Sequence, residues 1–452
     1  AASDVYKRQD NNGVHINAHG GGILYHQNKY FWYGEHKIEG EIGNTAQVGV
    51  HLYTSENLYD WKDEGIVLKV NKNDPSSDIY KGCILERPKV IYNKKTKKFV
   101  MWFHLEPINR GYEAARSGIA VSDSPFGPFD FIESIRPNAG VWPLNVQSFH
   151  KKSISSDVKK IYGGGPEHLP KHVDSLNLLG RDFKIGQMAR DMTLFVDDDD
   201  KAYHIYSSED NSTLHISQLS EDYLTHSGKY QRFFPSKFNE APTMMKTSLG
   251  KYFIISSGCT GWNPNAARSA SADNIFGPWE ELGNPCVSKD SLTTYYSQST
   301  YILPVKGAKD AFIFMADRWK PENPIEGKYI WLPLKIKDEK LVELEWKEKW
   351  DLSIFDNKKF NISIFSAYDF GRQNGDDNSL QGLEEIDPHF QVGLDMGYSL
   401  PLNFSLGYSI VTDVDDFYSG AYDSEFSLNY EKLAWINFKQ PFKIFLCAIK
   451  IS

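Results

Sequence analysis

The chain has 452 residues, a formal net charge of −9 and an aromatic content of 14%. Its length fits one large domain with a smaller one and is enough to bury a large core. The acidic balance and the lack of a basic stripe argue against a nucleic-acid partner, and no apolar run reaches the ~18 residues of a membrane helix. We therefore expect neither nucleic acid nor membrane as a partner of the large domain.

The N-terminal stretch "AASDVYKRQDNNG" has neither an initiating Met nor a signal-like apolar segment, so we expect a fragment or a processed form. The cysteines lie far apart without metal-binding or disulfide spacing. We expect free thiols at Cys83, Cys259, Cys286 and Cys447.

Five stretches share one pattern: a polar residue, a short apolar run, a turn rich in Asn, Asp, Gly or Lys, and a second apolar run. The runs contain many β-branched and aromatic residues and are too short for helices, which predicts β-hairpins. In chain order the stretches begin at Ala18, Leu85, Ala189, Asn239 and Ser297.

More polar segments between these hairpins also resemble one another. "SDSPFGPF" from Ser122 is similar to "SADNIFGPW" from Ser271, and "TSENLYDWK" and "SQLSEDYLTHSGKY" are looser relatives. Each repeat thus combines an inner hairpin with an outer pair of strands, and four-stranded units around an axis form a β-propeller. We predict an all-β fold, a five-bladed β-propeller over residues 13–350. The largest insertion, at 131–187, contains "YGGGPEHLP".

The composition changes after the fifth repeat, where Lys and Trp become rare and Phe, Ser, Asp, Gly and Leu increase. "FQVGLDMGYSLPLNFSLGYSIV", from Phe390 to Val411, alternates apolar and polar residues, which predicts amphipathic antiparallel strands. We expect a β-rich tail over 352–452. Its role is open between a small accessory domain and hairpins like those of outer-membrane proteins.

Polar residues that precede the five inner strands are candidates for one shared pocket. The innermost strand of each propeller blade lines the axis, so these residues meet at one mouth of it. One acid before a strand is more often a solvated cap, but equivalent positions in five repeats favour a functional pocket. The converging residues are His19 or Asn17, Glu86, Asp191, Glu240 and Gln298.

Three carboxylates and a glutamine in one pocket suit glycoside hydrolysis. One carboxylic acid protonates the leaving oxygen, and an inverting enzyme needs a second group about 6.5–9.5 Å away to activate water. The acid must have a raised pKa, and Asp191 or Glu86 near Glu240 would supply the necessary charge.

Three further residues have two interpretations each. Arg190 is expected to pair with a pocket carboxylate, the usual partner of an Arg beside acids. Trp262 is either a platform for a sugar or part of the core. His19 could instead ligate a central cation, such as a structural calcium in the axis; no other metal site is expected.

Several motifs resemble glycoside hydrolase family 43. "ARDMTLFVDDDDKAYHIYSSE", "NEAPTMMK" and the five-blade pattern are similar to the family at large. "INAHGGGILYHQNKYFWYGEH" and "YYSQSTYI" are similar to its exo-β-1,3-galactanase branch. The resemblance covers about residues 13 to 350. It implies an oligo- or polysaccharide substrate, no required cofactor and a secreted or periplasmic bacterial enzyme.

The resemblance also implies roles for single residues. Glu240 matches the general acid and Asp191 the residue that tunes its pKa. In the wider family an Asp at the start of the first blade is the general base, but this chain has Asn17 and His19 there. The galactanase branch uses a fifth-blade glutamine to hold the water, and Gln298 matches it. We expect the Gln298 amide oxygen to accept a hydrogen bond from water and its NH₂ group to hold a sugar hydroxyl.

The second-blade Glu86 matches a substrate ligand of that branch, and Asn17, His19, Arg190 and Trp262 are further candidates for substrate binding. The resemblance therefore predicts an inverting, exo-acting galactan 1,3-β-galactosidase of polysaccharide degradation. An α-L-arabinofuranosidase or β-xylosidase is an alternative, which the missing first-blade Asp disfavours. A non-catalytic carbohydrate-binding propeller is another, which the same absence favours.

Overall fold

The computed structural model describes residues 8–154, 158, 173–337 and 341–355, and the backbone of 360–369, 389–399, 404–414 and 428–438. The chain divides into two compact units, Ala1–Ile354 and Phe355–Ser452. The predicted insertion motif "YGGGPEHLP" lies outside the described residues. None of the helices in the described parts has the length and apolar content needed to cross a membrane.

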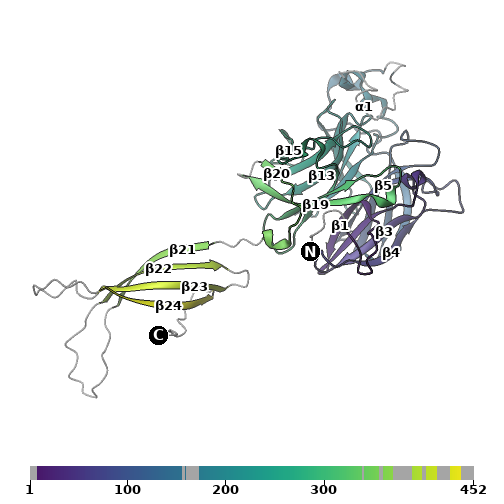
Figure 1. Cartoon of the computed structure of the whole chain (residues 1–452). Helices are drawn as coiled ribbons and strands as arrows, with labels where there is room; N and C mark the ends of the chain where they lie inside the picture. Colours follow the sequence, from purple (N-terminus) through teal and green to yellow (C-terminus); the bar gives the residue numbers. More distant parts are fainter. Residues whose placement is uncertain are drawn as a thin grey trace, which may run out of the picture. The chain divides into compact units, whose positions relative to one another are not determined.

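The first unit is a five-bladed β-propeller, which confirms the predicted fold (Figure 1). Each blade is an antiparallel sheet of four strands that follow one another in the chain, and each begins with one of the predicted hairpins. Blade 1 contains β1 (His19–His26), β2 (Lys29–His36), β3 (Gly49–Ser55) and β4 (Lys62–Lys69). Blade 2 contains β5 (Ile84–Asn93), β6 (Lys98–Glu106), β7 (Arg116–Ser122) and β8 (Asp130–Ile135).

The other three blades repeat this order. Blade 3 contains β9 (Met192–Val196), β10 (Ala202–Ser208), β11 (Thr213–Leu219) and β12 (His226–Phe233). Blade 4 contains β13 (Asn239–Lys246), β14 (Tyr252–Gly258), β15 (Arg268–Ala272) and β16 (Glu280–Gly283). Blade 5 contains β17 (Gln298–Pro304), β18 (Phe312–Arg318), β19 (Lys328–Lys337) and β20 (Leu341–Leu344).

Helical turns occur only in the connections of the described chain. The one α-helix is α1 (Leu178–Arg181), and the 3₁₀ turns are η1 (Glu41–Asn44), η2 (Ser148–Lys151), η5 (Val173–Leu176), η6 (Ser291–Thr293), η7 (Pro324–Glu326) and η8 (Leu352–Phe355).

The five innermost strands form a closed ring. β1 contacts β5, β5 contacts β9, β9 contacts β13, β13 contacts β17, and β17 returns to β1. Since every blade uses consecutive strands, hydrogen bonds between the first and last blades help to close the ring. The Tyr329 hydroxyl accepts from the Ala18 N–H at 2.9 Å and donates to the Ile16 carbonyl at 2.8 Å. This closure fixes the first inner strand beside the last one.

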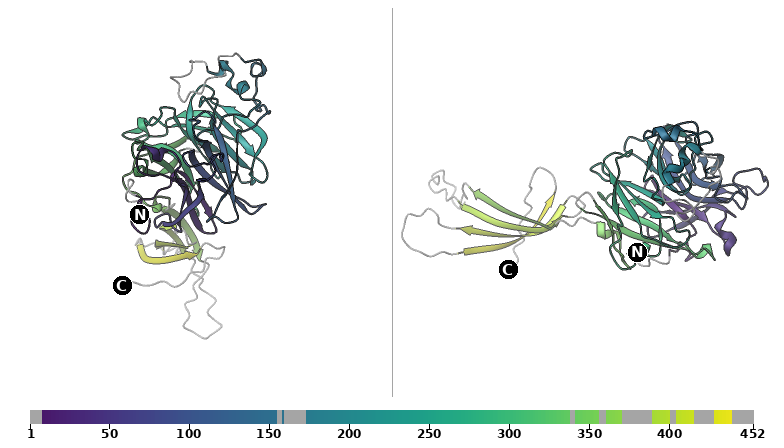
Figure 2. Two further views of the ribbon diagram at one scale, coloured as in Figure 1. Left: turned by 90° about the vertical axis from the view of Figure 1, so that its right-hand side faces the viewer. Right: turned by 90° about the horizontal axis from the view of Figure 1, so that it is seen from above.

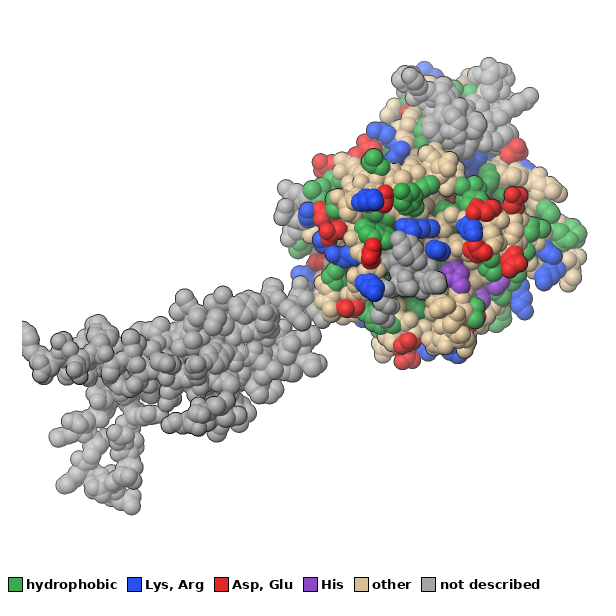
Figure 3. All heavy atoms as spheres, viewed as in Figure 1, with side chains coloured by type: hydrophobic (Ala, Val, Ile, Leu, Met, Phe, Trp, Pro, Cys, Tyr) green, Lys and Arg blue, Asp and Glu red, His purple; other side chains and the backbone are tan. Residues whose placement is uncertain are grey.

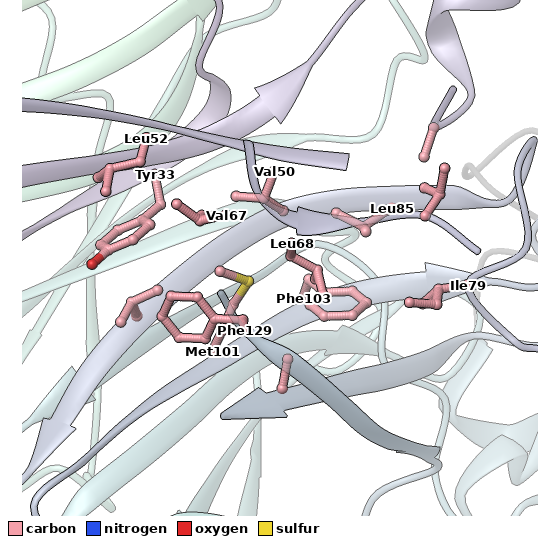
Figure 4. Close-up of a cluster of buried hydrophobic side chains, with 14 of the residues drawn as sticks. Tyr33, Val50, Leu52, Val67, Leu68, Ile79, Leu85, Met101, Phe103 and Phe129 are labelled. Carbon is pink, nitrogen blue, oxygen red and sulfur yellow. The ribbon is translucent and has the colours of Figure 1, made fainter. Parts of the chain in front are cut away.

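Apolar side chains fill the spaces between neighbouring blades. Between blades 1 and 2, Tyr33, Val50 and Leu68 pack with Met101 and Phe103, and all are buried (Figure 4). Such contacts remove apolar surface from water, which is the main stabilising contribution to folding. Three of the four cysteines also lie buried as free thiols, as predicted, whereas Cys447 lies outside the described residues.

The insertion between β8 and β9 packs against the outer edge of blade 3. The Leu144 N–H donates to the Tyr230 carbonyl at 2.8 Å, and the Tyr230 hydroxyl donates to the Val141 carbonyl at 2.9 Å. Trp142 and Phe183 stack with their ring centroids 4.1 Å apart. The described parts of the insertion, which include α1, are therefore a fixed extension of blade 3.

The second unit contains one antiparallel sheet of β21 (Phe360–Asp369), β22 (His389–Ser399), β23 (Phe404–Val414) and β24 (Leu428–Phe438) (Figure 2). β22 and β23 pair over the stretch in which the alternating sequence predicts two strands. The C-terminal region is thus β-rich, as predicted.

Candidate active site

Bulges in the inner strands direct polar side chains toward the mouth of the axis. The pairing registers shift between His19 and Gly22, between Glu86 and Lys89, and between Glu240 and Thr243. The residues that directly follow His19, Glu86 and Glu240 have left-handed φ angles: 59° at Gly20, 57° at Arg87 and 48° at Ala241. A bulge bends its strand and re-aims a side chain. The same local irregularity thus recurs where the sequence predicts site residues.

Glu240 lies at the start of β13 and has the environment of a protonated acid. Burial is the larger cause and the charge of Asp191 the second, and together they raise the pKa of Glu240 to about 8. The Asn211 side-chain amide donates to Glu240 Oε1 at 2.8 Å. A carboxyl group with this pKa keeps its proton at neutral pH and can donate it to a leaving group.

Asp191 is held by a residue that the sequence analysis did not single out. Arg87 donates to both oxygens of Asp191, from Nε to Oδ1 at 3.2 Å and from Nη2 to Oδ2 at 3.0 Å. The Ala241 N–H donates to the same Oδ2 at 3.0 Å. Two blades therefore fix the carboxylate of Asp191 beside the residue that follows Glu240.

Gln298 opens β17 and is joined to the same arginine. Its Oε1 accepts from Arg87 Nη2 at 2.6 Å and from Trp319 Nε1 at 2.9 Å, while its Nε2 donates to Ser257 Oγ at 3.0 Å. Because Arg87 and Trp319 can only donate, the amide oxygen must face them. Both lone pairs of Oε1 are then occupied. This arrangement differs from the expectation that Oε1 accepts from water, because only the second N–H of Nε2 can bind water without displacing one of these donors.

Glu86 belongs to a hydrogen-bonded chain in blade 2. Its carboxylate accepts from His104 Nδ1 at 3.1 Å and from the Tyr112 hydroxyl at 2.9 Å. Burial alone would raise the pKa of Glu86, but the hydrogen bond and charge of His104 outweigh it and lower this pKa to about 2. On the other side, His104 Nε2 lies 3.0 Å from Glu106 Oε1. Glu86 is thus a fixed anion at neutral pH.

Asn17 and His19 are both buried. The Asn17 side chain donates to the Lys37 carbonyl and accepts from the Lys37 N–H, both at 2.8 Å. His19 is fully buried, stacks on Tyr329 at a centroid distance of 5.2 Å, and lies 3.8 Å from Asp317. Their contact with substrate stays a prediction.

A calcium ion in the axis stays a prediction. Calcium prefers six to eight oxygen ligands, but the Lys89 ammonium group donates to the Gly20 carbonyl at 2.8 Å, next to His19. Within the described residues, the one group of three potential metal ligands is Glu86, His104 and Asp191, and Asp191 is already paired with Arg87.

A cavity of about 280 Å³ adjoins Gln298. Its lining includes Trp262, Tyr296 and Trp319, and the Trp262 and Trp319 rings meet edge to face at 6.0 Å. Trp262 is 45% exposed, which excludes the core interpretation of this residue. Aromatic faces beside polar groups suit the binding of a sugar ring.

Arg190 is buried, and its guanidinium group donates to the Tyr112 carbonyl at 3.1 Å from Nε and 2.6 Å from Nη2. Tyr112 in turn contacts Glu86, so Arg190 supports the site through a tyrosine. The sequence analysis missed Arg87, His104, Asn211 and Trp319. Arg87 and Trp319 do stand in short polar stretches beside inner strands, but only the blade arrangement brings them to Gln298.

On the face of the first unit in Figure 3, acidic and basic side chains are interspersed and form no continuous basic patch.

Residues 173–308 match Glycosyl hydrolases family 43. The chain is 49% identical to a family-43 β-1,3-galactosidase solved with galactodeoxynojirimycin; the match covers 77% of this chain and 100% of that chain, with a TM-score of 0.72. A second family-43 β-1,3-galactosidase is 30% identical, covering 89% and 76% at a TM-score of 0.64. An exo-β-1,3-galactanase from Clostridium thermocellum is 28% identical, covering 91% and 83% at a TM-score of 0.61. No curated protein sequence matches the chain.

Proposed function

The chain belongs to glycoside hydrolase family 43 and is a glycosidase, and on this premise we propose that it is an exo-acting galactan 1,3-β-galactosidase that releases galactose with inversion. The observation that carries the chemistry is Glu240, whose pKa of about 8 keeps it protonated beside Asp191. The 49% identity to a β-1,3-galactosidase supports the substrate class.

In the proposed reaction, Glu240 gives its proton to the glycosidic oxygen as the bond from that oxygen to the anomeric carbon breaks. Water attacks the anomeric carbon from the opposite face, which inverts the configuration, and the attacking water releases one proton to solvent as its oxygen bonds to that carbon. Gln298 positions this water. Its second N–H can bind one lone pair of the water and leave the other for the anomeric carbon. Arg87 and Trp319 fix the amide plane that aims this N–H.

The remaining predicted residues are assigned to substrate. Glu86 carries a fixed negative charge that can accept hydrogen bonds from sugar hydroxyls, and Trp262 can stack on a sugar beyond Gln298. Arg190 holds Tyr112 against Glu86, and Asn17 and His19 shape the floor of the mouth. We assign no cofactor to this reaction, because proton transfer and water attack need only the groups above.

A secreted or periplasmic location follows from the substrate. We propose this location because a polymeric galactan does not enter the cytoplasm, whereas a secreted enzyme meets the polymer and a periplasmic one its shorter fragments. Fractionation of the native host into periplasm, medium and cytoplasm, followed by immunoblotting, tests this location; retention in the cytoplasm would contradict it.

The alternatives are separated by one substrate panel. The protein is incubated with β-1,3-galactan, β-1,4-galactan, and aryl arabinofuranoside and xyloside substrates, and the products are resolved by chromatography. We expect galactose as the product from β-1,3-galactan alone, and at least ~10²-fold slower release from a Glu240→Gln control. Release of arabinose or xylose would indicate the other family activities, and no release from any substrate would indicate a binding propeller.

A further inference from the structure

The turn between β10 and β11 has an unusual backbone. Glu209, Asp210 and Asn211 are consecutive non-glycine residues, and their φ angles of 53°, 53° and 65° are all left-handed. L-amino acids adopt this region as isolated residues and rarely in succession. Such a conformation persists only when its surroundings hold it, and it often marks a functional site.

Glu209 is held on one side of the turn. Its buried carboxylate accepts from His215 Nε2 at 2.8 Å and from Arg232 Nε and Nη2, each at 2.6 Å. Arg232 also contacts the insertion, because its Nη1 lies 3.0 Å from His150 Nε2 and its Nη2 donates to Asp174 at 2.5 Å.

Asp210 is held on the other side by α1 of the insertion. It is fully buried and receives both terminal nitrogens of Arg181, Nη1 at 2.7 Å and Nη2 at 3.2 Å. Arg181 is itself oriented by two hydrogen bonds to Asp182, both of 2.9 Å. Two bidentate pairs therefore fix the turn immediately before Asn211.

The third residue of the turn, Asn211, contacts the acid with its side chain. Asn211 is buried, and its Nδ2 donates to Glu240 Oε1 at 2.8 Å. The carbonyl oxygen of a protonated carboxyl group accepts hydrogen bonds better than its hydroxyl oxygen does, so the amide bond to Oε1 favours the proton of Glu240 on Oε2. The contact therefore selects which oxygen of the acid is the donor.

We propose that Asn211 is a positioning residue for Glu240: it fixes the rotation of the carboxyl group and directs the protonated oxygen toward the leaving group. The assignment rests on the proposed function for the role of Glu240. The charged and titratable groups that face Glu240 are Asp191, Arg87, Arg190 and the Cys259 thiol. Cys259 offers only a weak S–H donor, so the Asn211 amide is the stronger neutral donor to this carboxyl group.

Asn211→Gly is the informative variant. Glycine adopts a positive φ without strain, so the turn keeps its conformation while the amide is lost. A hydrogen bond donated to a carboxylate favours its ionised form, so its loss moves the pKa of Glu240 upward, by about one unit for a bond to a charged group. Asn28→Gly is the matched control: Asn28 also has a left-handed φ, of 62°, but lies in the exposed turn between β1 and β2.

The first measurement needs no substrate. Carboxyl-¹³C glutamate is incorporated, the Glu240 signal is assigned by its absence in Glu240→Gln, and its titration is followed by NMR. We expect the midpoint to rise in Asn211→Gly and to stay unchanged in Asn28→Gly. An unchanged midpoint in Asn211→Gly would overturn the proposal, whether or not the protein cleaves β-1,3-galactan.

The second measurement compares kcat on β-1,3-galactobiose and on 2,4-dinitrophenyl β-galactoside, whose leaving group needs little protonation. Asn211→Gly should lower kcat at least about tenfold on the disaccharide and much less on the aryl substrate. Equal losses on both substrates would indicate a general structural defect and contradict the positioning role. Inactivity of the wild type on both would refute the proposed function and leave the NMR result to decide the proposal.

Discussion

At the scale of single residues, the site depends on the proton of Glu240, whose surroundings disfavour the ionised form of this carboxyl group. Burial and Asp191 raise the pKa of Glu240 to about 8, so this carboxyl group is protonated up to mildly alkaline pH. Glu240→Gln keeps the shape and the hydrogen bond from Asn211 but removes the proton donor. We expect kcat on β-1,3-galactan to fall at least ~10²-fold, measured by galactose release at pH 6 to 7.

An aryl substrate with a very good leaving group is the control for Glu240→Gln, because it should lose much less activity. Unchanged kcat on galactan would remove Glu240 from the acid role.

The effect of Asp191 on the pKa of Glu240 can be tested through the pH dependence of kcat/KM. For the wild type, kcat/KM should fall above about pH 8, where Glu240 loses its proton. Asp191→Asn removes a like charge and frees the positive charge of Arg87, and both changes favour ionised Glu240. The alkaline limb should therefore move to lower pH. Asp123→Asn, at an exposed surface position, should leave it in place.

If the alkaline limb of correctly folded Asp191→Asn stays where it is in the wild type, Asp191 does not tune the acid.

Gln298 is predicted to orient the water rather than to remove its proton. Its Oε1 is occupied by Arg87 and Trp319, so Gln298→Ala should lose both the water site and a partner of Arg87. We expect kcat to fall by at least ~10²-fold with a smaller change in KM. Gln298→Glu has the same length and replaces the N–H that holds the water by a carboxylate oxygen that can accept a hydrogen bond and a proton from it, so this variant should keep measurable activity.

Steady-state kinetics on β-1,3-galactobiose distinguish these variants. Galactose release at the wild-type rate by Gln298→Ala would place the water on another residue, with Glu86 and His19 the next to test.

At the scale of elements, the insertion between β8 and β9 acts on the site through the turn after β10. Arg181→Met combined with Asp210→Asn removes their ion pair, and the buried Asp182, which also loses Arg181, keeps its ion pair with Arg136 at 3.3 Å. The turn then keeps the pair between Glu209 and Arg232 but loses the pair between Asp210 and Arg181. We expect kcat to fall about 3- to 10-fold, which corresponds to roughly 1 kcal/mol in the activation free energy. The control is Lys62→Met with Glu64→Gln, which removes a surface ion pair of blade 1.

A wild-type kcat in the Arg181→Met, Asp210→Asn variant would mean that the turn keeps its conformation without the ion pair between Arg181 and Asp210.

Elements also determine how much the sequence could predict. The five inner hairpins follow from alternating patterns and turn residues, because each is local and recurs. The bulges after Glu86 and Glu240 could not be predicted from the sequence. Arg87 and Ala241 adopt left-handed φ angles there, and neither position has the glycine that would indicate such a conformation. The bridge from Arg87 to Asp191 and Gln298 joins three blades. This bridge depends on the closed ring. The pattern of the single repeats therefore predicts Asp191 and Gln298, the two ends of the bridge, but not Arg87 between them.

At the scale of the whole molecule, ring closure makes the site. Three of the five inner strands contribute Glu86, Glu240 and Gln298 directly, and the loop before β9 contributes Asp191. Tyr329 and the Ala18–Ile16 backbone close blade 5 on blade 1. All of these residues belong to the first compact unit, so the chemistry is assigned to the propeller.

The central claim is that this propeller hydrolyses β-1,3-galactan with inversion, and one measurement tests it most directly. The wild-type protein is mixed with β-1,3-galactotriose, and the anomeric protons are followed by ¹H NMR before mutarotation. The account predicts that galactose is released and that its α-anomer appears first. First appearance of the β-anomer, or no release of galactose, would contradict it.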